Sequence, residues 1–149
     1  MQTYCTQADL EAIWPAASLL ASVDDDATGT LSATELGYIA RAIERAANAI
    51  NARLETRYSL ADLAANAWCR DANAAIAAYW LATRRGVAAP AQLQQQHDAY
   101  LAALDQIAAG LWKVPEAPES HTPGPSVTNF EIRLDEPYRK AQRVEETSV

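Results

Sequence analysis

An acidic segment in the first quarter of the chain has the residue types and spacing of a calcium-binding loop. Oxygen-bearing side chains recur around Gly29 in the order of an EF-hand loop, which supplies calcium with six to eight oxygen ligands. The ligands would be Asp24, Asp26, Thr28, the Thr30 carbonyl and Glu35. The same residues also suit an acidic turn leading into a capping box, in which Ser32 and Glu35 satisfy free backbone groups at a helix start. EF-hands usually occur in pairs and Pro15 lies in the incoming segment, so we favour the capping interpretation and keep calcium as the alternative.

The other potentially reactive side chains stand alone. A metal site around His97 would need a second ligand one helical turn away, whereas residues 93 and 101 are both leucine. Cys69 has no histidine at helical spacing, and Cys5 has no partner motif. The sequence contains no nucleophile elbow, no glycine-rich phosphate loop and no dinucleotide fingerprint. It therefore predicts no enzymatic activity, no bound metal and no cofactor.

Composition restricts the class of protein further. The 149 residues suffice for one domain with a core, and half of them are hydrophobic. Nineteen acidic residues against 12 basic ones give a net charge of −7, which argues against a tightly held nucleic acid. No apolar run approaches the roughly 20 residues that cross a bilayer, and the N-terminus is not that of a signal peptide. The two isolated cysteines indicate a reducing cytoplasm, and we expect no membrane association.

The elements that must position these residues are helices. Alanine is abundant, and apolar residues repeat at alternating threes and fours, the period of a helix with one buried face. We predict a short helix from residue 7 to about Pro15, a long one from residue 33 to about 56, and two more over 60–84 and 90–110. The expected fold is all-α, a four-helix bundle with the long second helix at its centre, in a helical domain of residues 1–112.

The C-terminal part of the chain has a different composition. Prolines and Gly124 predict a linker over residues 113–126, followed by an extended arm over 127–149. Within the arm, Phe130, Ile132 and Leu134 alternate with charged residues, which predicts a strand at 129–135. No second strand is evident, so we expect this strand to be completed by another protein, with Tyr138 as a further contact.

Two aromatic and two basic residues are candidates for a subunit interface. Tyr79 and Trp80 are adjacent on one predicted helix and point about 100° apart, so both cannot easily face a single small core. Arg41 and Arg45 lie on the polar side of the long helix. Aromatic residues and arginines are enriched at protein interfaces, so these four residues would mark a contact between subunits.

The arginines of the long helix also leave a third function open. Arg41, Arg45, Arg53 and Arg57 could form the basic face of a DNA-packaging or regulatory protein. Glu44 and Glu55 interleave with them and no lysine joins them, so we rank this interpretation below the calcium-binding module.

Several of these features together resemble a known family. They are the start Tyr4-x-Thr6-x-x-Asp9-Leu10, the acidic turn with Gly29, the long helix closing on Arg57-Tyr58, the stretch from Ala75 to Leu81, and Pro90 before the last helix. This arrangement resembles the Mu-like prophage head–tail adaptor proteins, also called head-completion or connector proteins of tailed phages. The resemblance covers about residues 1–112, and a Ser-Leu pair stands where the family often has a proline after Arg-Tyr.

The resemblance implies a structural protein of the virion. Such adaptors form a ring, commonly a dodecamer, between the portal protein and the tail or neck proteins at the head–tail junction. DNA passes through the bore without specific binding, and an acidic wall would repel its phosphates. The subunit would be made in the cytoplasm of the bacterial host and then incorporated into the particle.

Overall fold

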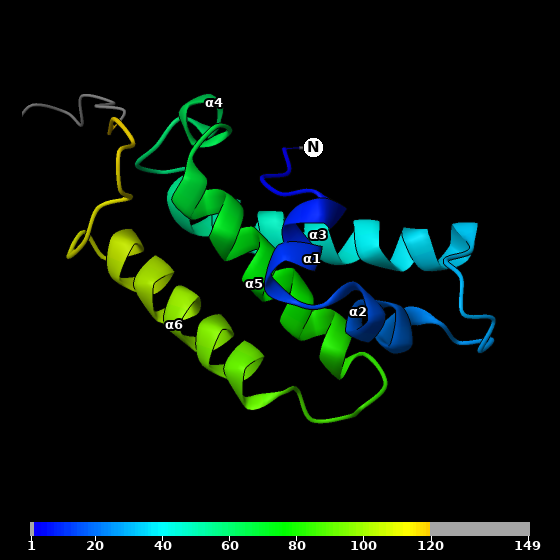
Figure 1. Ribbon diagram of the computed structural model, residues 1–149. Coiled ribbons are helices and arrows are strands. Elements are labelled where there is room, and N and C mark those ends of the chain that lie inside the picture. Colours follow the sequence, from blue (N-terminus) through cyan, green and yellow to red (C-terminus); the bar gives the residue numbers. More distant parts are fainter. Residues whose placement is uncertain (1, 120–149) are drawn as a thin grey trace, which may run out of the picture.

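The computed structural model describes residues 2–119, which form an all-α body (Figure 1). Its helices are α1 (Gln7–Ile13), α2 (Ala16–Val23), α3 (Ala33–Leu54), α4 (Leu60–Leu63), α5 (Ala67–Thr83) and α6 (Ala91–Ala108). Within residues 2–119 no strand occurs, so the all-α prediction is confirmed for this part of the chain. The predicted strand at 129–135 lies outside the described residues.

The centre of the body is α5, which packs against α1, α2, α3 and α6 (Figure 1). Residues 72–78 of α5 are all buried, and most of them are alanines. Because alanine side chains are short, neighbouring helices can approach α5 from several directions. For the same reason the sequence of α5 shows no single apolar stripe. The prediction that the long helix is central was therefore wrong, because α3 is the longest helix but packs mainly through one face.

The number of helices also differs from the four predicted. Residues 16–23 form α2 directly after Pro15, which serves as its N-cap. The helix predicted over 60–84 is divided into α4 and α5, because Asn66 stops the first and caps the second. The Asn66 side chain accepts a hydrogen bond from the Cys69 amide at 3.1 Å and donates one to the Pro115 carbonyl at 2.7 Å.

Two aromatic contacts join α5 to α6. Near the start of α5, Trp68 meets Tyr100 edge to face, with ring centroids 5.6 Å apart. Near its end, Tyr79 stacks on His97 with centroids 3.8 Å apart. The apolar stripe of α3 closes the other side of α5, and its residues Ile39, Ile43, Ile50 and Leu54 are buried as the spacing predicted. Leu36, which the spacing also placed on this stripe, lies in the first turn of α3 and is 44% exposed.

The residues that follow α6 pack onto the helices. Val114 is buried, and its amide donates to the Tyr58 hydroxyl at 3.1 Å. The Arg57 guanidinium pairs with Glu119 at 2.5 Å and donates to the Ile107 carbonyl at the end of α6. Residues 113–119, which begin the predicted linker, therefore belong to the helical body. None of the helices in the described part of the chain combines the length and the apolar character needed to cross a membrane.

Candidate interaction surfaces

Three of the four predicted interface residues come together on one surface. Arg41 and Arg45 are exposed one turn apart on α3, and Trp80 of α5 lies beside them. They line a shallow hollow of about 170 Å³ whose other walls include Tyr38 and Arg84. We call this surface the arginine–tryptophan groove. Sequence spacing alone did not place Trp80 beside these arginines, because the two groups lie on different helices.

Cation–π contacts organise the groove. The Arg45 guanidinium lies 4.4 Å from the centroid of the Trp80 ring, and Arg84 lies 4.4 Å from that of Tyr38. Arg84 is also paired with Asp25 at 2.5 Å, and this hydrogen bond raises the pKa of Arg84 and lowers that of Asp25. No described residue forms an ion pair with Arg41 or Arg45, so these two carry the positive charge of the groove. Arginine beside tryptophan and tyrosine is the composition of an interface hot spot.

Tyr79 is directed away from this groove. Its ring stacks on His97, and the His97 Nδ1 lies 2.9 Å from the Asp98 carboxylate. The two adjacent aromatics of α5 therefore serve two different neighbours, Trp80 facing α3 and Tyr79 facing α6. Both rings have contacts within the subunit. The prediction from sequence assumed that the two rings would have to share one small core and did not consider that they could contact different helices.

The four arginines of α3 and its C-terminal end do not form one basic face. Arg53 pairs with Asp105 of α6 at 2.7 Å, and Arg57 is engaged by carbonyls at the end of α6 and by Glu119. Only Arg41 and Arg45 remain unpaired among the described residues, which weakens the interpretation as a DNA-binding helix.

The acidic segment is organised by backbone amides and arginines. The Asp24 carboxylate accepts hydrogen bonds from the amides of Thr28 at 3.1 Å and Gly29 at 2.8 Å, which lower its pKa. Gly29 has a φ of +72°, a conformation that favours glycine. Asp25, which is outside the EF-hand ligand positions, is held by Arg84 and Arg85 of the α5 end.

The remaining calcium-site candidates have separate roles. Glu35 is buried, and its carboxylate accepts from the Ser32 amide at 2.5 Å, so the predicted capping box is present. Thr28 donates its hydroxyl hydrogen to the Thr30 carbonyl at 3.0 Å. Within residues 2–119, no three acidic, histidine or cysteine side chains lie together as a metal-binding group. Asp24 and Glu35 are thus engaged with backbone amides, the arrangement that the capping interpretation predicts.

Buried residues that sequence reasoning missed hold the body together. Asn73 on α5 accepts hydrogen bonds from the amides of Tyr4 at 3.0 Å and Cys5 at 3.2 Å, and donates to the Ile43 carbonyl at 3.0 Å. A single polar residue inside an alanine-rich stretch was the available signal. Burial raises the pKa of both Cys5 and Cys69 to about 12, so both thiols are protonated.

The arm residues Phe130, Ile132, Leu134 and Tyr138 lie outside the described residues. No curated protein and no solved structure matches the chain. The family described as Bacteriophage Mu, Gp36 matches residues 4–131, which is most of the chain and includes Arg57, Tyr58 and the helical body. The protein therefore belongs to the bacteriophage Mu Gp36 family.

Proposed function

We propose that the protein is a head–tail connector subunit, which forms a ring between the portal and the tail of a phage particle. The observation that carries the proposal is the family match over residues 4–131, which indicates a phage structural or morphogenesis protein. The connector role within that class rests on the resemblance of residues 1–112 to head–tail adaptors. The ring would be a dodecamer in the virion, with portal and tail or neck proteins as its partners.

The side chains of the described body support a structural role. The arginine–tryptophan groove offers an anchor of the kind found at subunit interfaces. His97 is stacked on Tyr79, and both cysteines are buried thiols with raised pKa values, so these groups serve packing. A net charge of −7 suits a wall along which DNA slides without being held. We therefore propose a non-catalytic subunit that needs no cofactor.

The proposal is tested by deleting the gene from its phage or prophage and examining the particles by electron microscopy. A connector is needed to join the two halves of the virion, so we expect DNA-filled heads and free tails that do not unite. Supplying the wild-type gene from a plasmid should restore tailed particles, and antibody against the protein should label the junction. Normal tailed particles from the deletion strain would refute the connector role.

A matched pair of variants links the groove to this role. Replacing Arg45 with Glu removes the cation above Trp80 and reverses its charge, whereas Gln92→Glu adds a negative charge at an exposed position of α6 outside the groove. We expect Arg45→Glu to lower the yield of tailed particles at least about tenfold, because arginine anchors beside aromatic rings contribute strongly to interfaces. Gln92→Glu should complement nearly as well as the wild type. Equal complementation by both would exclude the groove from assembly.

A further inference from the structure

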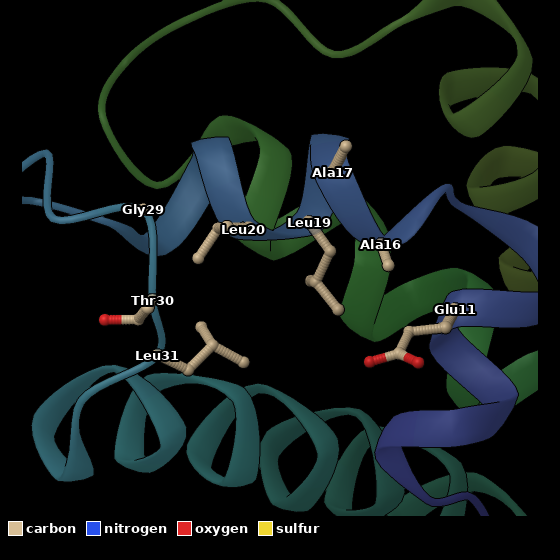
Figure 2. A pocket seen from close by; sticks show the side chains of 8 residues that line it. All are labelled: Glu11, Ala16, Ala17, Leu19, Leu20, Gly29, Thr30 and Leu31. Atoms are coloured by element: carbon tan, nitrogen blue, oxygen red, sulfur yellow. The ribbon is translucent and has the colours of Figure 1, made fainter.

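A second hollow lies at the end of the molecule where α3 begins. Figure 2 shows it bounded by α1, α2 and the loop before α3, with Leu20 and Leu31 directed toward each other across it. Its volume is about 400 Å³, and its surface is mostly apolar. Glu11 extends toward it from α1, and no basic side chain among the described residues pairs with this carboxylate. The carboxylate accepts a hydrogen bond from the Gln7 side chain at 2.8 Å. The hollow is therefore an apolar site whose rim carries one negative charge that no described cation pairs.

The opposite end of the molecule presents apolar side chains next to a positive charge. Leu111 is 79% exposed and Trp112 is 50% exposed, although both are large and hydrophobic. Lys113 follows them, with its side chain 74% exposed and 3.3 Å from Glu119. The backbone here is held in place, because the Arg57 guanidinium donates to the carbonyls of Ile107 and Trp112. We call residues 111–113 the C-terminal knob.

The knob and the hollow of one molecule are too far apart to meet. Arg57 follows the C-terminal end of α3 and holds the knob there, whereas Leu31 precedes the N-terminal end of α3 (Figure 1). The 22 residues of α3 separate the two ends by about 33 Å at 1.5 Å per residue. A knob at one end and a hollow at the other suit a head-to-tail contact, which builds a closed ring when its rotation closes.

We propose that the C-terminal knob of one copy occupies the apolar hollow of the next copy. Leu111 and Trp112 enter between Leu20 and Leu31, and Lys113 exchanges its exposed contact with Glu119 for one with Glu11, so apolar and charged groups both meet complementary groups. This inference rests on the proposed ring and adds the surfaces that connect neighbouring subunits. A contact of so few side chains is smaller than a standard stable interface. Free subunits therefore associate weakly, and many linked contacts stabilise the assembled ring.

Two variants remove the two halves of the contact separately. Leu111→Ser with Trp112→Ser removes the knob and keeps the hollow. Ala16→Arg keeps the knob and places a long cation in the hollow, where Figure 2 shows Ala16 beside Glu11. All three positions are exposed, so the helical body should remain folded, as circular dichroism will check. Val87→Ser and Ala12→Arg are the matched controls, because both positions are exposed and lie outside the knob and the hollow.

The experiment measures the mass of assemblies by sedimentation at protein concentrations up to about 1 mM. We expect the wild type and both controls to form oligomers that grow with concentration, and each contact variant to associate at least about tenfold more weakly. An equal mixture of the two contact variants should form dimers and nothing larger, because one intact knob meets one intact hollow. This complementation distinguishes a head-to-tail contact from any symmetric one.

Three outcomes would overturn the inference. They are a wild type that stays monomeric at the highest concentration, contact variants that associate like the wild type, and a mixture that yields no dimer. These outcomes are independent of the test of function. Labelling at the head–tail junction without head-to-tail pairing would refute only this contact, and pairing without incorporation into particles would refute only the connector role.

Discussion

Asn73 is the side chain on which three parts of the body depend. Its amide group joins the amides of Tyr4 and Cys5 to the Ile43 carbonyl inside the core. Replacing Asn73 with Ala would leave these buried backbone groups without partners, so we expect a loss of about 3 kcal/mol in the free energy of unfolding. Urea denaturation followed by circular dichroism measures it. Asn48→Ala, at an exposed position of α3, should change stability by less than about 0.5 kcal/mol.

The buried thiols make stability depend on alkaline pH. The pKa values of Cys5 and Cys69 are raised from 9.0 to about 12 by burial, and that of Tyr4 from 10.0 to about 12. Above pH 9 the unfolded thiols ionise while the folded ones stay protonated, so rising pH favours the unfolded state. We expect full stability below pH 9 and a progressive loss toward pH 12, measured as the urea midpoint at each pH.

A variant and a reactivity measurement check the cause of this loss. Cys69→Ala should reduce the alkaline loss, because one of the two shifted thiols is gone. In the native wild type both thiols should react slowly with iodoacetamide, since protonated and buried sulfur is a poor nucleophile, and unfolding should expose both. Rapid alkylation of the folded protein, or a midpoint unchanged above pH 9, would contradict the prediction.

At the scale of elements, the acidic loop before α3 is expected to hold itself without calcium. The Asp24 carboxylate accepts hydrogen bonds from two loop amides and Glu35 completes the capping box, whereas the Asp26 side chain forms no hydrogen bond or ion pair with a described residue. We therefore expect Asp24→Ala to lower the melting temperature measurably and Asp26→Ala to leave it almost unchanged. Removing or adding calcium should leave the melting temperature of the wild type unchanged.

Calorimetry with chelator and with added calcium checks this prediction for the wild type and both variants. A bound ion at a hundred times its dissociation constant would stabilise the fold by about 2.7 kcal/mol, a shift that calorimetry detects easily. A calcium-dependent rise in melting temperature that Asp26→Ala abolishes would restore the EF-hand interpretation.

Arg57 connects the ends of two helices to the chain that follows them. Arg57→Ala would leave the carbonyls of Ile107 and Trp112 without this donor and remove the ion pair with Glu119, so we expect a loss of about 2 kcal/mol and faster proteolysis within residues 112–119. Arg53→Ala is the control, because its pair with Asp105 is exposed and worth less than about 1 kcal/mol. Thermal melting and limited trypsin digestion of both variants give the comparison.

The sequence predicted the elements whose signals are local. The capping box of Ser32 and Glu35 and the apolar stripe of α3 depend on residues a few positions apart, and both are present in the structure. The central place of α5 was missed, because alanines pack on every side without a periodic signal. Trp80 reaches Arg45, and Tyr58 reaches Val114, across separate elements, so no spacing in the sequence indicates these contacts. The division of residues 60–84 at Asn66 depends in part on the hydrogen bond from the Asn66 side chain to the Pro115 carbonyl. Pro115 lies 49 residues further along the chain, so local spacing does not reveal this bond.

For the whole molecule, the boundary of the folded body is expected at residue 119 or beyond. A chain ending after Glu119 keeps buried Val114 and the Arg57–Glu119 pair, so its melting temperature should match that of the full chain. A chain ending after Trp112 loses both, and burial of one valine alone is worth about 1.5 kcal/mol, so it should melt several degrees lower. Equal melting of the two truncated chains would show that residues 113–119 add no stability.

The same pair of truncations separates folding from attachment. If the arm binds a neighbouring component, as the alternation of Phe130, Ile132 and Leu134 predicts, the chain ending at Glu119 should fold normally yet fail to enter particles. Incorporation of that chain at wild-type levels would exclude the arm from the connector's attachment.

The attachment of residues 113–119 also determines how the subunit responds to mechanical force. A pull on the chain beyond Glu119 reaches the helices first through the ion pair with Arg57 and then through buried Val114. Arg57 contacts the end of α6 and follows α3 in the chain, so the force is divided between these two long helices. It therefore does not act on the terminal turn of one helix alone. The outer ion pair would yield before the apolar anchor, so the subunit would lengthen slightly before it unfolded.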